Sequence, residues 1–143
     1  MVEGRLHKMS KIKLTKQQIF DLEVKYSHLW KDWFFNSNSS EEKFTDERFW
    51  TILSNKVGLD EDFIRDFKDF LNWHSICNVN RLTEDFIREF QDYVDWKAIS
   101  YGQCLSEDFV KEFKDKLDWE AIYFCQKLSD DFIIEMHKEG YIK

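Results

Sequence analysis

The chain contains no proline and only four glycines among its 143 residues. Proline and glycine are the strongest signals of tight turns, and all-β folds and glycine-rich phosphate-binding loops depend on them. Their scarcity argues against a sandwich, a barrel or a nucleotide-binding loop. It favours helices joined by short polar connections.

Cysteine and long apolar runs are also scarce. The three cysteines are Cys77, Cys104 and Cys125, an odd number with no CxxC pair. Residues 1–10 lack the apolar core of a signal peptide, and no run of about 18 apolar residues could span a bilayer. The sequence therefore predicts free thiols, a reducing cytoplasmic location and no membrane partner.

Aromatic residues and charge are what the chain has in abundance. Phenylalanine and tryptophan number 14 and 6, which is enough to build a sizeable core. Residues 1–18 carry five positive side chains and one negative one, and the remainder carries 16 positive and 27 negative ones. We expect residues 1–12 to form a flexible basic arm. Direct nucleic-acid binding is disfavoured because the acidic remainder has no basic stripe.

A repeat of 23 residues runs from Leu59 onward without slippage. Its four copies start at a leucine, and position 5 of each copy is a phenylalanine. Position 15 is Trp73, Trp96 and Trp119 in the first three copies. Such self-similarity is typical of repeat architectures, in which each copy packs only against its neighbours. The four copies begin at Leu59, Leu82, Leu105 and Leu128.

Each copy predicts two helices. Position 2 is Asp60, Thr83, Ser106 or Ser129, which are typical N-cap residues. In the third copy the first helix is expected from about residue 107 to residue 116, with apolar side chains at helical spacing. Asn72, Asp95 and Asp118 predict a second cap, followed by a helix of about eight residues that starts at the tryptophan. Helices this short need their neighbours, which predicts an all-α solenoid of short helix-pair repeats.

Charges and the chain's two ends complete the fold prediction. Glu84–Arg88 and Glu107–Lys111 have the spacing and order of stabilising pairs along one helix. Gly140 is placed to end the last helix, with Ile142 closing a Schellman-type contact. Residues 13–58 predict degenerate helical repeats with a loop insertion at 36–42, and residues 59–143 predict the regular array with its C-terminal cap.

The pattern LSEDFxxEFxDxxDWxxIS resembles short α-helical tandem repeats in proteins of giant amoebal viruses, of phages and of some bacteria. It covers residues 59–143 well and residues 14–58 poorly. The resemblance implies a viral or phage origin, and hence the host cytosol as the location. It brings over no catalytic residue.

Catalytic and metal-binding chemistry finds little support. His74 and Cys77 form HxxC, but the three cysteines fall at repeat positions 19, 23 and 21 and would not converge on one zinc ion. We interpret them as small buried apolar residues. Acidic pairs such as Glu84–Asp85 recur at helix starts, where they serve the fold. The sequence thus predicts no metal, no cofactor and no enzymatic activity.

The best candidate site is a variable face on the second helix of each copy. Positions 16 and 19–23 change between copies while the framework hardly does, and solenoids commonly bind through such a face. The alternative is that these side chains pack between copies and differ by drift. The candidate residues are His74, Asn78, Lys97, Tyr101, Glu120, Tyr123 and Phe124.

The function predicted from these features is a non-enzymatic protein–protein interaction module that binds a partner protein of unspecified identity. One alternative is an acidic inhibitor of a host nucleic-acid-binding or defence protein, which the excess of acidic residues favours. Another is a virion or scaffold component that assembles with copies of itself.

Overall fold

The computed structural model describes residues 13–29, 44 and 47–143, so the predicted arm 1–12 and insertion 36–42 lie outside the described residues. Every regular element in the described ranges is a helix, which confirms the predicted all-α class. The chain divides into two compact units, residues 1–72 and 73–143. The border falls inside the first regular repeat, between its two helices.

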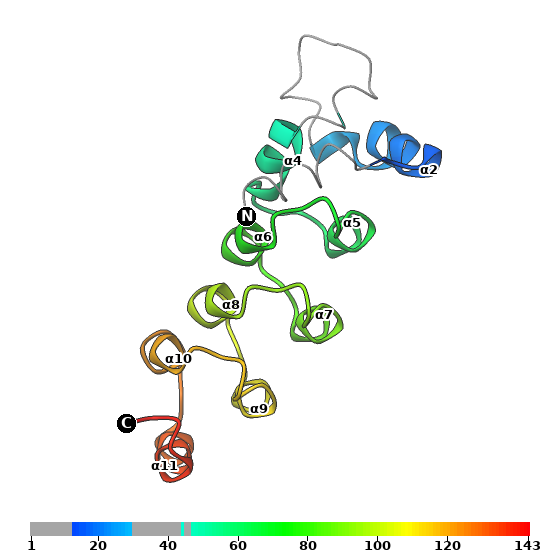
Figure 1. The fold of residues 1–143 in the computed structure, drawn as a ribbon. Helices are drawn as coiled ribbons and strands as arrows, with labels where there is room; N and C mark the ends of the chain where they lie inside the picture. Colours follow the sequence, from blue (N-terminus) through cyan, green and yellow to red (C-terminus); the bar gives the residue numbers. More distant parts are fainter. Residues whose placement is uncertain (1–12, 30–43, 45–46) are drawn as a thin grey trace. The chain divides into compact units, whose positions relative to one another are not determined.

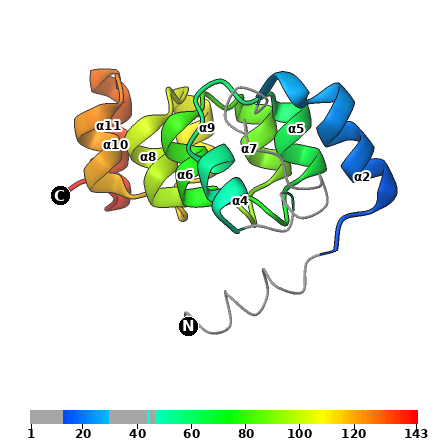
Figure 2. The ribbon, with the colours of Figure 1, turned by 90° about the horizontal axis from the view of Figure 1, so that it is seen from above.

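The described part of the first unit is made of short helical segments. Thr15 starts the first of them with a reciprocal capping box, because its hydroxyl accepts from Gln18 N–H at 3.1 Å and its own N–H donates to Gln18 Oε1 at 2.9 Å. This helix runs on into a π-helical turn (Figure 2). The segments are α2 (Lys16–Phe20), η1 (Asp21–Lys25), the 3₁₀ turn η2 (Ser27–Leu29), α4 (Glu47–Ser54) and α5 (Glu61–Asp66).

Aromatic side chains hold these segments together. The ring of Tyr26 meets Phe63 edge-on at 5.0 Å, and its hydroxyl donates to Asp66 Oδ2 at 2.8 Å. Burial is the main reason that the pKa of Tyr26 is raised. Trp50 donates from Nε1 to the Phe44 carbonyl at 2.7 Å. The described residues of the N-terminal part are therefore helical, as predicted, and their aromatic side chains pack together with those of α5.

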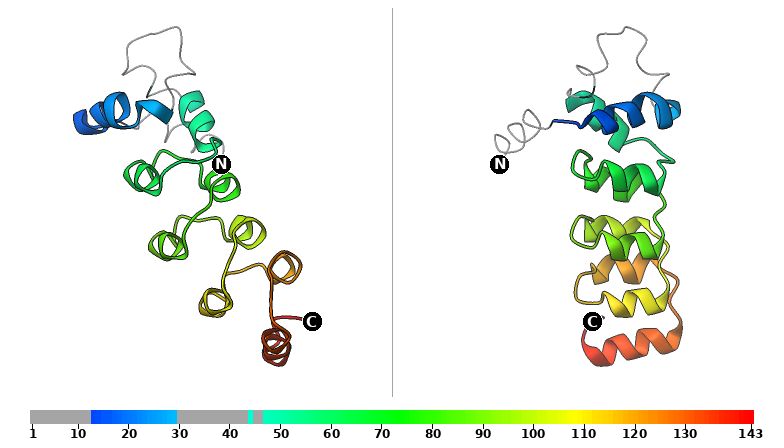
Figure 3. Two further views of the ribbon diagram at one scale, coloured as in Figure 1. Left: turned by 180° about the vertical axis from the view of Figure 1, so that it is seen from behind. Right: turned by 90° about the vertical axis from the view of Figure 1, so that its right-hand side faces the viewer.

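The second unit consists of two rows of helices, and the second and third repeats each contribute one helix to each row (Figure 1). We call α7, α9 and α11 the A row and α6, α8 and α10 the B row. Neighbouring B-row helices pack directly on one another, and the side view in Figure 3 shows the stacking. The bounds are α6 (Trp73–Val79), α7 (Glu84–Glu89), α8 (Trp96–Gly102), α9 (Glu107–Glu112), α10 (Trp119–Cys125) and α11 (Asp130–Glu139).

The predicted caps are confirmed at five helix starts, whereas Asp60 precedes α5 without a side-chain cap hydrogen bond. Thr83, Ser106 and Ser129 each accept a hydrogen bond at 3.2 Å from the N–H three residues later. Asp95 and Asp118 cap α8 and α10 through their carboxylates. Each cap satisfies backbone donors that a helix start leaves unpaired, so these boundaries are set locally.

Helix α9 of the A row is shorter than predicted. Helix α9 ends at Glu112 rather than near residue 116, because Phe113 turns to φ −109° and ψ 23° and its carbonyl accepts from Lys116 N–H at 2.9 Å. The indole of Trp119 then donates to the Lys114 carbonyl at 2.8 Å. The recurring tryptophan thus satisfies a carbonyl of the turn that replaces the last part of the helix.

The C-terminal helix ends as predicted. Gly140 adopts φ 88°, a left-handed conformation that glycine tolerates best. Its N–H donates to His137 O at 3.1 Å, and Tyr141 N–H donates to Met136 O at 3.0 Å. This is the Schellman pattern, and Ile142 is buried beside it.

Candidate interaction surface

Small polar side chains at repeat position 19 join each B-row helix to the next. Ser100 accepts from Asp118 N–H at 2.9 Å and donates to Trp96 O at 2.7 Å. The sulfur of Cys77 receives the N–H of Asp95 in the same way, and burial raises the pKa of the Cys77 thiol to about 11. This position faces the following repeat, so Cys77 and Ser100 belong to the fold rather than to a variable surface.

A buried amide at position 22 makes the second junction of the B row. Gln103 accepts at Oε1 from Leu82 N–H at 2.9 Å and donates from Nε2 to Cys77 O and Asn80 O at 2.8 and 2.7 Å. Gln126 repeats the arrangement one repeat later. Placing position 22 among the variable positions was therefore wrong. An amide side chain stands there in the first three repeats, which is the sequence signal that could have identified it.

All seven candidate residues lie exposed on the B row, at positions 16 and 20 with Tyr123 at position 19. Tyr101 and Tyr123 are 50% and 47% exposed, and Phe124 is 77% exposed. The three helices thus present changing side chains on an otherwise repeated backbone. The full set is His74 and Asn78 on α6, Lys97 and Tyr101 on α8, and Glu120, Tyr123 and Phe124 on α10.

His74 is the candidate that also contacts the next repeat. Its Nδ1 lies 2.6 Å from Asp95 Oδ2, and Asn78 Nδ2 lies 3.1 Å from its Nε2. The hydrogen bond with His74 is the largest cause of the lowered pKa of Asp95. Position 16 therefore faces the following repeat while remaining accessible to solvent.

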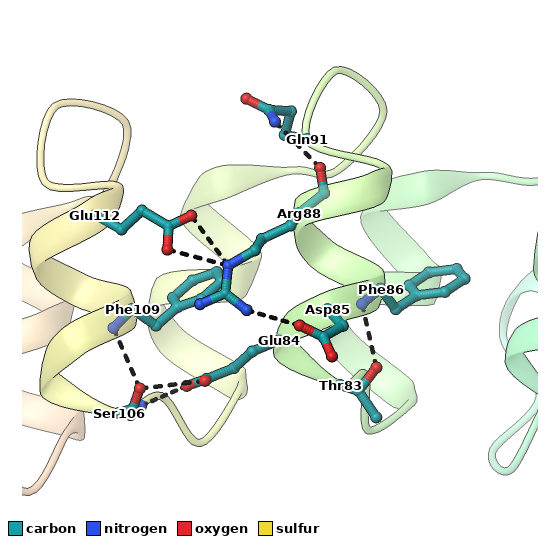
Figure 4. Close-up of polar contacts among 9 residues, drawn as sticks. All are labelled: Thr83, Glu84, Asp85, Phe86, Arg88, Gln91, Ser106, Phe109 and Glu112. Carbon is teal, nitrogen blue, oxygen red and sulfur yellow. Dashed lines mark hydrogen bonds and ion pairs between the residues drawn. The ribbon is translucent and has the colours of Figure 1, made fainter.

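Charged side chains join the A-row helices (Figure 4). Glu84 accepts from the backbone N–H of Ser106 at 2.7 Å. Arg88 pairs with Glu112 at 3.0 Å and with Asp85 at 2.8 Å. The predicted Glu84–Arg88 pair is therefore wrong, because each of these two side chains reaches the next helix of the row instead.

The A row also carries exposed carboxylates. Asp85, Asp108 and Asp131 occupy position 4 of successive repeats, and all three are exposed. A shallow pocket of about 200 Å³ lies between α9 and α11. Lys111 bonds Glu135 across it at 2.7 Å, so this pair of side chains joins the two helices. The predicted Glu107–Lys111 pair is likewise replaced, since Glu107 accepts from Ser129 N–H.

The cysteines separate into two kinds. Cys77 is buried as predicted, but Cys104 and Cys125 are exposed, so their assignment to the interior was wrong. Both follow the buried part of a B-row helix, where the chain crosses to the next repeat. Within the described ranges, no three His, Cys, Asp or Glu side chains are grouped as metal ligands. None of the helices described there has the length and apolar character needed to cross a bilayer.

Two helix rows, repeated caps and a repeated buried amide define this chain as an α-helical repeat protein. No known protein family, curated protein or solved structure matches it. The resemblance of its repeat to those of giant viruses and phages stays a prediction.

Proposed function

We propose that this protein is a non-enzymatic interaction module that binds a partner protein through the exposed side chains of the B row. The observation that carries the proposal is the exposure of Tyr101, Tyr123 and Phe124 on successive helices of that row. Aromatic side chains dominate the binding energy of protein interfaces, and clustered exposed apolar side chains mark interaction sites.

The different roles of the repeat positions support the same proposal. Position 19 in α6 and α8, and position 22 after α8 and α10, bind the neighbouring repeat, so substitutions there disturb the fold. Position 16 carries His74, Lys97 and Glu120, three chemically different side chains that are all exposed. Such positions can change partner specificity without loss of the fold, which is how repeat scaffolds diversify.

Capture from host-cell lysate tests this function, with nuclease added to remove partners held through nucleic acid. We expect wild-type protein to retain one stoichiometric protein, and the variant Lys97→Glu/Tyr101→Ala to lose it. The matched control is Ile134→Ala, because Ile134 is 51% exposed on α11 of the A row. Equal capture by wild-type protein and the B-row variant would contradict the proposed face.

A second candidate function is inhibition of a host nucleic-acid-binding or defence protein through the acidic A row. The exposed carboxylates of Asp85, Asp108 and Asp131 favour it, because a row of carboxylates imitates a phosphate backbone. The resemblance to viral and phage repeats supports a host protein as the target. Binding through this row should weaken steeply with salt and be lost on Asp85→Asn/Asp108→Asn/Asp131→Asn, whereas binding through the B row should survive both changes.

A further inference from the structure

In α6 and α8, one face of the helix packs against the next helix of the B row. Helix α10 presents the same face. In α8, Ser100 at position 19 bonds the cap residue of α10, and in α6 His74 at position 16 bonds the cap residue of α8. Positions 16 and 19 of a B-row helix therefore face the next helix of that row. Position 19 is buried in α6 and α8, where it holds Cys77 and Ser100, but in α10 it holds Tyr123, which is 47% exposed. Position 16 is exposed in all three helices.

The side chains of this face differ from those at the internal junctions of the B row. Cys77 and Ser100 are small, so the backbone N–H of the following cap comes within hydrogen-bonding distance of their sulfur or oxygen. Position 19 of α10 instead carries the much larger ring of Tyr123. Beside it, Phe124 meets Tyr123 edge-on at 5.5 Å and is 77% exposed. The face is thus aromatic where the internal junctions are small and polar.

We propose that a second copy of this chain covers the face, with α10 packed antiparallel against α10 of the second copy about a two-fold axis. Glu120 lies in the first turn of α10, and the exposed Lys127 follows its C-terminus. Antiparallel pairing places Glu120 opposite Lys127 of the second copy. The two-fold axis repeats this pair with the roles of the two copies exchanged. It also brings Tyr123 and Phe124 together with their counterparts at the centre, as an isologous interface requires.

The size of the face determines how strong this dimer is. An aromatic side chain buries about 150–250 Å² when it is fully covered, so covering the exposed fractions of Tyr123 and Phe124 in both copies removes roughly 500 Å² from water. Stable interfaces bury about 1,200–2,000 Å². The dimer is therefore weak and reversible, because its interface is smaller than that of a stable complex. This inference goes beyond the proposed function, because it concerns the pure protein and needs no other partner.

Sedimentation equilibrium of the purified chain up to about 1 mM tests the dimer. The variant Tyr123→Ser/Phe124→Asn places at positions 19 and 20 the residues that α8 and α6 carry there, so the helix keeps side chains that its own repeat accommodates. We expect self-association to weaken at least about 30-fold, as for the loss of two central aromatic anchors. The control Tyr101→Ala should leave it unchanged. A strictly monomeric wild-type protein, or equal association of wild-type protein and the double variant, overturns the proposal.

A charge exchange tests the antiparallel arrangement. Glu120→Lys and Lys127→Glu should each weaken self-association by about fivefold to tenfold, because each turns two attractive pairs into repulsive ones. The double variant Glu120→Lys/Lys127→Glu should recover the wild-type constant within about twofold, and a mixture of the two single variants should form a mixed dimer. If the double variant is no better than the single ones, the antiparallel pairing is wrong. Lysate capture is a separate measurement, so the failure of either proposal leaves the other standing.

Discussion

The two helix rows of the second unit share one repeat length but are joined by different chemistry. Neighbouring A-row helices are connected by exposed charges, such as Arg88 with Glu112 and Lys111 with Glu135. Neighbouring B-row helices are connected chiefly by neutral groups, the buried amide of Gln103 and the hydroxyl of Ser100, although the exposed His74 also contacts the carboxylate of Asp95. A primary amide both donates and accepts, so it can satisfy three backbone groups without burying a charge.

This difference indicates which row determines the spacing of the repeats. Buried hydrogen bonds are costly to leave unmade, whereas exposed ion pairs are weak and screened by salt. The B row therefore fixes the register between repeats, and the A row tolerates changes of charge. A surface for partners is then best carried on the outer positions of the rigid B row.

The largest expected effect comes from Gln103→Leu. The substitution leaves the N–H of Leu82 and the carbonyls of Cys77 and Asn80 without the amide that binds them. We expect the free energy of unfolding to fall by about 3 kcal/mol, measured by urea denaturation. Gln126→Leu should cost less, because Gln126 is only half-buried. A loss below about 1 kcal/mol for Gln103→Leu would contradict the leading role of the B row.

The second-largest effect is expected from alkaline pH, which should lower the stability of the packing in the B row. Burial raises the pKa of Cys77 to about 11 from a usual value of 9.0, so the folded protein retains a proton that the unfolded chain releases. Stability is therefore lost as the pH rises from about 9 to about 11, by roughly 1–3 kcal/mol. The measurement is the difference in unfolding free energy between wild-type protein and Cys77→Ala across this interval. A difference independent of pH would show that the thiol is not buried as described.

Ser100→Ala should have a smaller effect. It removes the acceptor of one backbone group, Asp118 N–H, whereas Gln103→Leu leaves three backbone groups without their partner. We expect a loss of about 1 kcal/mol in thermal or urea unfolding. Ser54→Ala offers the matched test in the first unit, because Ser54 accepts from Asn72 N–H at 2.8 Å in the same way. Clearly different losses at the two sites would mean that the two units do not use this junction alike.

The smallest effect is expected from Glu112→Gln in the A row. The side chain keeps its shape but loses its charge opposite Arg88, which lies at the surface. We expect a loss smaller than that of Ser100→Ala, and one that disappears at about 1 M salt because exposed pairs are screened. Unfolding measured at low and high salt checks this. A loss that persists at high salt would remove the contrast between the rows.

Sequence patterns predicted the helices of this fold better than the contacts between neighbouring repeats. Thr83, Ser106 and Gly140 were identified correctly because a cap acts on backbone groups within a few residues. The end of α9 was missed because the indole of Trp119 and a tight turn replace the last helical turn. The exposed candidates Tyr101 and Phe124 were found because variation between copies shows which positions the framework leaves free.

By itself, the sequence determined the helical class, the 23-residue period and where each helix of the array begins, since these follow from composition, periodicity and local caps. Only the tertiary structure decided which polar side chains join neighbouring repeats and which face solvent. Gln103 binds groups 21 to 26 residues away, and Ser100 binds one 18 residues away. Local spacing cannot reveal such partners, because they come within reach only when successive repeats stack.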